Sequence, residues 1–417
     1  MQMFKSIKVY EYQRLYVGTH GFEQRHLDAL LRLNEYHDWK YFQSIAKGIQ
    51  FNQYVGAVQI DDLLIEIHPK IDAERTVNKW QGVLLQMLEV CEVIKPTLAG
   101  IARVKRTTLN LIEIYFETYL LEIEKLARTG FIKRYRKKTS NTKALKGKLD
   151  FSRHIQKNLV HKERFYNAHQ VYDTNHLLHQ ILYKALKIVG QFTKGTGLHD
   201  LYKRVELNFP KVYHKHITKN HLNSLSLGRN SVKYSYSLQL ARLIILNYSP
   251  DISGGEEKMF SLLFDMNILW ETYILKSLEK RCERNDIDVI GQPSKSFWGT
   301  KSLRPDIVLK RNGKTYILDT KWKCPKNGEV AVSDLRQMYT YCRFWNAEKA
   351  LLLYPGETKG NDFQCFEIQD VLESQNKNTT MITHKCKIEF VSVVKGNGTI
   401  NENLGIEILK ILETSPV

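Results

Sequence analysis

The sequence has 417 residues, of which 43% are hydrophobic, so it is long enough for two or three folded domains. It contains no run of about 18 apolar residues, which argues against a membrane span, and its first residues lack the apolar core of a signal peptide. Its six cysteines are scattered without a Cys-x-x-Cys pair, so we expect reduced thiols in a cytoplasmic protein rather than a disulfide or zinc framework.

The net charge of +18 is concentrated in the middle of the chain. Residues 1–100 hold 11 Lys or Arg against 12 Asp or Glu, residues 101–250 hold 28 against 9, and residues 251–417 hold 23 against 23. A strongly basic segment between two neutral ones predicts that the middle of the chain binds a polyanion.

The first hundred residues predict a small α+β domain. Residues 7–10 read as a strand, residues 26–33 as a helix, and residues 54–60 and 63–68 as a hairpin that turns at Asp61 and Asp62. This segment carries no charge excess and no catalytic constellation. It is either a structural domain or a surface for docking a protein partner.

Residues 101–250 predict a basic, mainly helical region. Apolar residues recur at helical spacing over 77–93, 112–128, 175–192 and 238–246. His176 and His179 stand three residues apart, a spacing that can bind metal, but no acidic or cysteine partner is near, so a packed helix surface is expected. The segment 250–255, rich in Gly and Pro, predicts the boundary to the next domain.

The strongest basic stretch runs from Lys125 to Leu149, with ten Lys or Arg and no acid. A run of charge is often only a solvated face. Because the charge excess of the chain lies in this third, contact with DNA phosphates is the favoured interpretation. The residues assigned to DNA contact are Lys133, Arg134, Arg136, Lys137, Lys138, Lys143, Lys146 and Lys148.

Residues 303–323 predict two strands joined by a tight turn, since Asn312-Gly313 suits a type I′ hairpin. The hairpin brings Asp306 near Asp319, and alternation along the second strand places Lys321 beside Asp319. Two converging carboxylates repel each other unless a cation lies between them, and a hard divalent metal fits best. The alternative is an ordinary solvated hairpin with charged residues on its outer face.

Elements on either side of the hairpin extend this pattern. A helix over 260–281 would place Glu271 in a stripe with Phe264, Ile268 and Leu275, where a carboxylate needs a partner. After the hairpin, Ser333 can cap a helix that carries Gln337 and Tyr341 on one face. Residues 349–355 then read as a buried strand that ends at Pro355, and residues 385–394 as a late strand.

This order of elements resembles the PD-(D/E)xK nuclease core, in the branch whose last helix carries a Gln-x-x-x-Tyr motif. The amino-acid sequences of segments 58–70, 145–151 and 264–271 are similar to those of the McrC family, the nuclease subunits of McrBC-type restriction systems. The resemblance runs from about residue 50 to about residue 395. It implies a partner-docking domain at 1–100, a DNA-contacting region at 101–250 and a nuclease domain at 251–417. The nuclease domain is expected to be a mixed sheet flanked by helices.

The resemblance also implies roles for individual residues. Asp306, Asp319, the Thr320 carbonyl and Glu271 would hold Mg²⁺, Lys321 would orient water and stabilise charge, and Gln337 and Tyr341 would position the site or the DNA. The expected reaction is hydrolysis of DNA phosphodiesters, in DNA that carries modified cytosine, as a defence against foreign DNA.

Nucleotide hydrolysis is expected on another polypeptide. The sequence contains no Gly-x-x-x-x-Gly-Lys-[Ser/Thr] P-loop. The McrC resemblance implies an AAA+ partner of the McrB type that binds GTP. Two alternatives stay open: a stand-alone DNA-repair nuclease of the same superfamily, and a non-catalytic DNA-binding adaptor.

Overall fold

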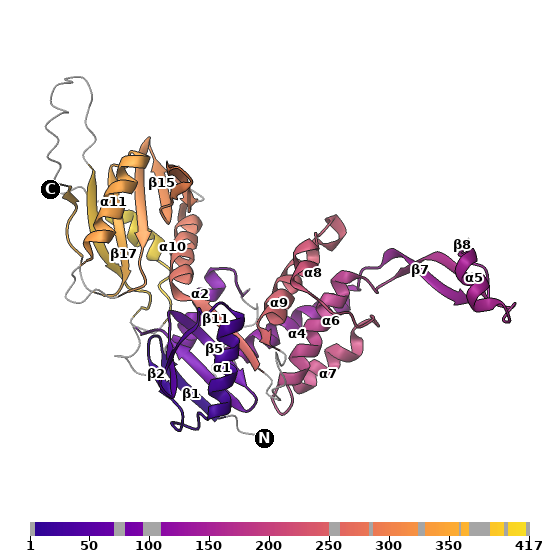
Figure 1. The fold of residues 1–417 in the computed structure, drawn as a ribbon. Helices are drawn as coiled ribbons and strands as arrows, with labels where there is room; N and C mark the ends of the chain where they lie inside the picture. The colour runs from indigo at the N-terminus through magenta and orange to yellow at the C-terminus, as the bar shows by residue number, and fades with distance from the viewer. Residues whose placement is uncertain are drawn as a thin grey trace. The chain divides into compact units, whose positions relative to one another are not determined.

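The computed structural model describes residues 5–70, 80–94, 110–249, 259–282, 287–323, 330–357, 360–366, 384–395 and 399–413. The chain divides into two compact units. The first comprises residues 1–5, 59–63 and 108–262, and the second comprises residues 6–58, 64–107 and 263–417 (Figure 1). Each unit is described by itself below.

The N-terminal elements surround the hairpin that the sequence predicts. This hairpin, β5 (Tyr54–Ile60) and β6 (Leu63–His68), lies in a five-stranded sheet of order β1-β6-β5-β11-β10. Its side chains are buried almost throughout, including those of the polar residues Gln59 and Glu66. Nearby elements are β1 (Lys5–Tyr10), α1 (Gln24–Tyr36), α2 (Trp80–Val90) and the sheet β2-β4-β3, formed by Arg14–Tyr16, Gly48–Phe51 and Phe42–Ile45.

The first unit has a helical core. The helices predicted at 112–128, 175–192 and 238–246 are present as α4 (Leu111–Thr129), α6 (Leu177–Phe192) and α9 (Ser235–Leu246). Asn110 caps α4 by accepting a hydrogen bond from the Glu113 amide at 2.9 Å. The remaining elements are α7 (His199–Asn208), α8 (Lys219–Ser224), a 3₁₀ helix (Arg229–Tyr234) and the short strand β10 (Tyr248–Ser249).

The prediction of a mainly helical middle region is wrong for its most basic part. Strand β7 (Arg134–Thr142) pairs along its whole length with β9 (Phe165–Asp173), which also pairs with β8 (Lys148–Leu149). With α5 (Phe151–Asn158) these strands form an arm, which we define as residues 133–173 (Figure 1). Polar side chains occupy both faces of β7, so the sequence shows no apolar period that distinguishes a strand from a loop.

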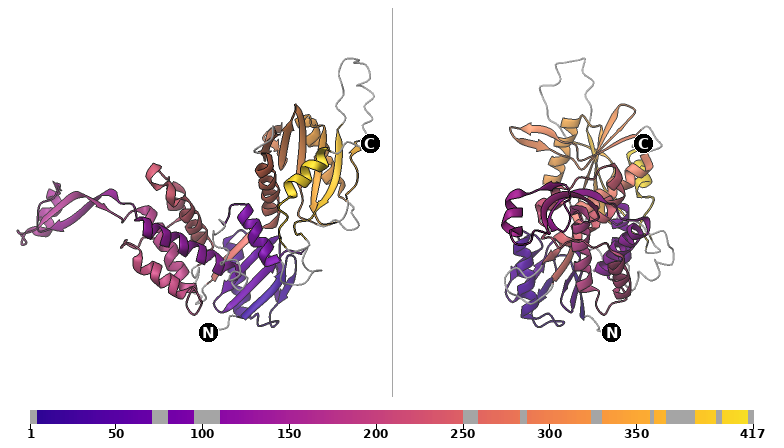
Figure 2. Two further views of the ribbon diagram at one scale, coloured as in Figure 1. Left: turned by 180° about the vertical axis from the view of Figure 1, so that it is seen from behind. Right: turned by 90° about the vertical axis from the view of Figure 1, so that its right-hand side faces the viewer.

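The C-terminal part of the second unit contains a six-stranded sheet of order β12-β15-β16-β17-β19-β18. Helix α11 (Val332–Trp345) covers one face, and α10 (Met266–Cys282) and α12 (Leu404–Glu413) cover the other (Figures 1 and 2). The strands are Ile287–Gly291, Ile307–Arg311, Lys314–Thr320, Lys349–Pro355, Lys385–Val391 and Gln364–Cys365, in that order. The strands predicted at 349–355 and 385–394 are therefore confirmed, whereas α12 was not predicted.

Two helix predictions need correction. Residues 259–265 form strand β11 (Met259–Asp265), and α10 begins only at Met266; Ile268 is exposed, so the predicted apolar stripe through Glu271 does not exist. A short strand buried on both faces has no period that separates it from a helix. Helix α11 begins one residue before Ser333, with Ala331 at the N-cap, so Ser333 is not its cap.

Several sequence predictions concern residues outside the described ranges. They are the start of the helix at 77–93, the linker at 250–255 with its domain boundary, and Cys324. Among the described residues, no helix combines the length and apolar character needed to cross a membrane.

Candidate active site

The predicted hairpin is confirmed with its turn. Strands β15 and β16 pair antiparallel from Arg311↔Lys314 to Ile307↔Leu318, and Asn312 and Gly313 both have positive φ, 49° and 75°, as a type I′ turn requires. Asp306 directly precedes β15 and lies beside the end of β16, where the Thr320 backbone N–H donates to its carboxylate. Period-two alternation places Asp319 and Lys321 on the same face as Ile317, which packs in the core beneath α11.

Thr320 fixes the orientation of Asp306. Its backbone N–H and its hydroxyl both donate to Asp306 Oδ2, at 2.6 and 2.9 Å. Asp306 is half-buried, at the point where the chain enters β15. The end of the second strand therefore holds the carboxylate that precedes the first, a role for the Thr320 side chain that was not predicted.

Asp319 is a buried carboxylate in an unfavourable electrostatic position. Its side chain is 1% exposed, and burial, reinforced by repulsion from Asp306, raises its pKa to about 7 despite the nearby Lys321. Lys321 Nζ lies 2.7 Å from Asp319 Oδ2, yet among the described residues this oxygen accepts no hydrogen bond of normal geometry. Such an oxygen keeps its capacity to bind a cation.

Lys321 contacts both the Asp319 carboxylate and a side chain of α11. Its ammonium donates to Gln337 Oε1 at 3.2 Å, Gln337 Nε2 donates to the Tyr341 hydroxyl at 2.7 Å, and this hydroxyl donates to the Arg304 carbonyl at 3.0 Å. Burial alone would lower the pKa of Lys321, but the carboxylates of Asp319 and Asp306 outweigh it and raise the pKa, which keeps the ammonium charged. Gln337 and Tyr341 thus face one another, as the sequence predicted.

Glu271 reaches the site through Gln292. The Gln292 side chain donates to Glu271 Oε1, and its backbone N–H donates to the Asp306 carbonyl at 2.7 Å. Burial and the charge of Asp306 raise the pKa of Glu271. Gln292 was not predicted as a site residue, because an isolated Gln in a turn has no distinctive sequence pattern.

Two further contacts at the site were missed. Asp334 accepts from Lys323 Nζ at 2.6 Å and from the Tyr354 hydroxyl at 3.1 Å, and it adds negative charge near Asp319. Glu11 Oε2 accepts from Trp322 Nε1 at 3.0 Å, so a residue more than 300 positions earlier contacts the neighbour of Lys321. Both contacts depend on tertiary structure rather than on local spacing.

Asp306 and Asp319 alone could hold a divalent metal, whereas the full predicted ligand set does not come together as one group. In the described ranges, no three His, Cys, Asp or Glu side chains come together as a metal-binding group. Mg²⁺ typically uses one or two protein carboxylates and completes its shell with water and phosphate oxygens. Asp306 and Asp319 are two such carboxylates, and the buried Asp319 oxygen already faces a cation, the Lys321 ammonium.

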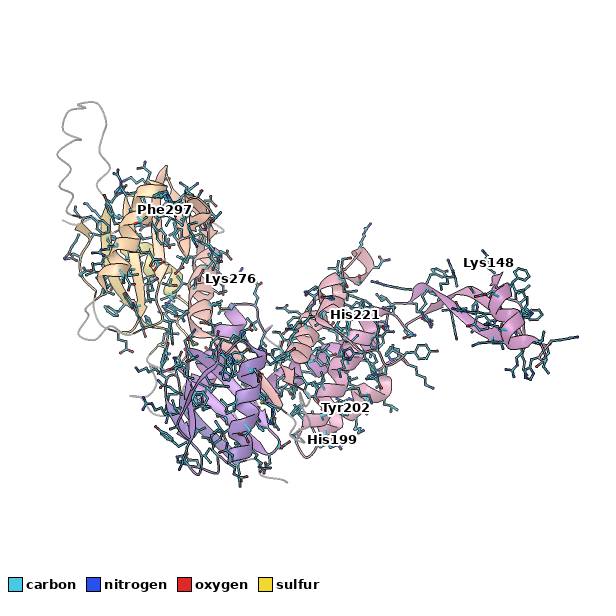
Figure 3. All side chains as sticks on the ribbon, viewed as in Figure 1. Lys148, His199, Tyr202, His221, Lys276 and Phe297 are labelled. Atoms are coloured by element: carbon cyan, nitrogen blue, oxygen red, sulfur yellow. The ribbon has the colours of Figure 1, made fainter. Side chains whose placement is uncertain are left out.

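The basic residues assigned to DNA contact all lie on the arm. Lys133, Lys137, Lys143, Lys146 and Lys148 are exposed, and Arg134 and Lys138 are half-buried. Arg136 differs, because its guanidinium donates twice to Asp173, at 3.0 and 2.8 Å. Figure 3 marks Lys148 within this arm. Arg136 therefore stabilises the arm, and the exposed lysines remain the candidates for phosphate contact.

A family model described as McrBC 5-methylcytosine restriction system component matches residues 49–355, which include Glu271, Asp306, Asp319 and Lys321 but not Glu11. The chain belongs to this family. A curated relative, the type IV methyl-directed restriction enzyme EcoKMcrBC of Escherichia coli K12, is 20% identical to this McrBC family member over 228 residues. The aligned region covers 51% of this chain and spans 64% of the length of that relative.

Two solved structures share the fold of this McrBC family member. A half-complex of Thermococcus gammatolerans McrB AAA+ hexamers with bound McrC contains a chain that aligns with a TM-score of 0.68 and 19% identity, covering 98% of this chain and 99% of that one. The McrBC complex of the same organism aligns with a TM-score of 0.50 and 21% identity, covering 66% and 87%.

Proposed function

We propose that this chain is the nuclease subunit of a McrBC-type restriction system and hydrolyses DNA phosphodiesters with Mg²⁺. The observation that carries the proposal is the convergence of Asp306, Asp319 and Lys321 at the end of one hairpin, where the buried Asp319 carboxylate lies 2.7 Å from the Lys321 ammonium. This arrangement supports a PD-(D/E)xK core. The family match supports a restriction role, with 5-methylcytosine DNA as the proposed substrate.

The roles of the residues follow from their contacts. Asp306 and Asp319 would hold the metal, with the Thr320 carbonyl as a further ligand and Glu271 oriented toward the same site by Gln292. Bound Mg²⁺ supplies positive charge that polarises the phosphate and acidifies a coordinated water. The Lys321 ammonium, held by Gln337, orients the attacking water and stabilises negative charge that develops on the phosphate oxygens.

The proposal includes an AAA+ GTPase partner of the McrB type. The sequence has no P-loop, so energy from GTP has to come from another polypeptide. A solved structure of similar fold contains McrB AAA+ hexamers with bound McrC. The exposed lysines of the arm would bind DNA phosphates in this assembly.

Four mixtures test the proposal. The purified chain is incubated with methylated DNA, Mg²⁺ and GTP, with and without the AAA+ partner, and each mixture is repeated with EDTA. Metal-dependent cleavage only in the presence of the partner is expected. Cleavage by the chain alone would favour a stand-alone nuclease, and the absence of cleavage in every mixture would favour a non-catalytic adaptor.

A further inference from the structure

A small hairpin precedes the candidate site and does not join the six-stranded sheet. Strands β13 (Lys295–Trp298) and β14 (Lys301–Leu303) pair only with each other among the described residues. The register shifts between Ser296 and Trp298, which marks a bulge at Phe297, and Gly299 turns the chain with φ 54°. Bulges redirect side chains and are common next to functional sites.

This hairpin is attached to α11. The Phe297 ring meets the Phe344 ring edge-on, with 5.3 Å between their centroids. Lys295 Nζ donates to the Phe344 carbonyl at 2.7 Å and lies 4.9 Å above the Trp345 ring. Figure 3 marks Phe297 in this part of the second unit. The hairpin is therefore fixed to the same helix that carries Gln337 and Tyr341.

Trp298 takes no part in this packing. Its side chain is 78% exposed, whereas Phe297 beside it is 51% exposed and contacts Phe344. A single exposed aromatic residue needs no explanation by itself. A Trp at the tip of an anchored hairpin offers a flat ring in a fixed place, which is the feature that a base-stacking platform needs.

The charge around Trp298 favours a polyanion. Residues 289–305 contain Lys295, Lys301 and Arg304 and no Asp or Glu. All three cations are exposed, and Lys301 is the cross-strand neighbour of Trp298. Basic side chains beside an exposed aromatic ring are typical of sites that bind nucleic-acid backbones and stack their bases.

The hairpin leads directly to the proposed metal ligands. Lys301 lies five residues before Asp306, so an extended chain spans at most about 17 Å between them, the length of about five nucleotides in a DNA strand. The Tyr341 hydroxyl holds the Arg304 carbonyl at 3.0 Å, which ties the end of the hairpin to the hydrogen bonds that reach Lys321. A nucleotide bound beside Lys301 would therefore lie within about five nucleotide lengths of the proposed metal ligands.

We propose that the β13–β14 hairpin is a DNA-binding element in which Trp298 stacks on an unstacked base within about five nucleotides of the cleaved phosphate, while Lys301 contacts the backbone. This inference deepens the proposed nuclease function and rests on it. The hairpin selects DNA whose bases are already unstacked near the cut, because opening an intact stack costs free energy.

The test measures binding of the full chain to a labelled duplex with a short unpaired gap, in an Asp319→Asn background that prevents cleavage. Trp298→Ala is expected to weaken binding about tenfold without changing the slope of log affinity against log salt, since stacking releases no counterions. Trp298→Phe is expected to restore most of the affinity. Lys301→Ala is expected to reduce the salt slope by about one unit.

Trp39→Ala is the matched control, because Trp39 is an exposed Trp of the same unit, at 53%. Unchanged binding by Trp298→Ala, or an equal loss with Trp39→Ala, would overturn the inference. Loss of affinity in Trp298→Phe equal to that in Trp298→Ala would also overturn it, because an aromatic ring is then not the required feature. A failure of the nuclease proposal would be seen in a different measurement, because the Asp319→Asn chain would then still cleave DNA.

Discussion

The candidate active site and the basic arm use charge in opposite ways. At the site, Asp306, Asp319 and Lys321 are at least partly buried, and each has a neighbour that orients it. On the arm, five of the residues assigned to DNA contact are exposed: Lys133, Lys137, Lys143, Lys146 and Lys148. Buried charges in a fixed geometry determine the rate of a reaction, whereas exposed charges determine affinity and its dependence on salt.

The largest effect on the cleavage rate is expected when the lysine of the site, Lys321, is removed. Lys321→Ala should lower the cleavage rate by about 10²- to 10³-fold, as expected when one group that stabilises developing charge is lost. DNA affinity should change little. Lys314→Ala, at the exposed start of the same strand, is the matched control and should cleave normally. A normal rate for Lys321→Ala would leave this lysine outside the chemistry.

The arm should show the reverse behaviour. Replacing Lys137, Lys143, Lys146 and Lys148 with Ala should reduce the salt slope by up to about four units and affinity by about 10²- to 10³-fold at physiological salt. Cleavage at saturating DNA should persist. The matched control replaces four exposed cations of the same unit that lie off the arm: Lys194, Lys211, Lys215 and Arg229. An unchanged slope in the arm variant would assign the arm to a solvated face or a protein-docking surface.

Glu11 gives a prediction about stability and pH. Its carboxyl is 2% exposed and accepts from Trp322 Nε1 and from the Lys70 amide, at 3.0 and 2.9 Å. Burial, opposed by these hydrogen bonds, raises its pKa from 4.5 to about 7. The folded chain then holds this proton more tightly than the unfolded chain, so stability is lost as pH rises from about 4.5 through about 7.

Glu11→Gln removes that ionisation and keeps an acceptor for both donors. Between pH 5 and pH 8, the Tm of the wild-type chain should fall relative to that of Glu11→Gln. The corresponding loss in the free energy of unfolding is up to about 3 kcal/mol. Thermal unfolding of both proteins at the two pH values measures the difference, with the exposed Glu35→Gln as control. If the wild-type chain instead gains stability relative to Glu11→Gln between pH 5 and pH 8, the predicted direction of the pH effect is wrong.

The smallest effect is expected at Tyr341. Tyr341→Phe keeps the buried ring but removes the hydroxyl that links Gln337 to the Arg304 carbonyl. The cleavage rate should fall about tenfold, which corresponds to the loss of one positioning hydrogen bond of about 1.4 kcal/mol. KM should stay nearly constant. A change in KM with constant kcat would instead place Tyr341 in DNA binding.

The local parts of the site could be predicted from the sequence. Asn312-Gly313 determines the turn, the turn determines the register, and the register brings Asp306 to the end of β16 that holds Asp319 and Thr320. The four-residue spacing of Gln337 and Tyr341 likewise predicts their contact on one helix face. Each of these inferences depends on a period or a turn that operates within about twenty residues.

The remaining features depend on contacts between distant segments. No local pattern links Glu11 to Trp322, or Gln292 to Glu271. Strand β11 was predicted as helix because burial on both faces erases its alternation, and β7 was missed because neither of its faces is apolar. Sequence periodicity reports which faces are buried, so it fails where both faces are buried or neither is.

The most direct test of the account is cleavage by Asp319→Asn. The substitution keeps the shape of the side chain but removes the charge that would hold the metal. The full chain is mixed with the proposed AAA+ partner, GTP, Mg²⁺ and methylated DNA, beside Asp288→Asn, an exposed Asp of strand β12, as control. The account predicts that Asp319→Asn binds DNA and partner normally and does not cleave, while Asp288→Asn cleaves. Cleavage by Asp319→Asn near the wild-type rate would contradict it.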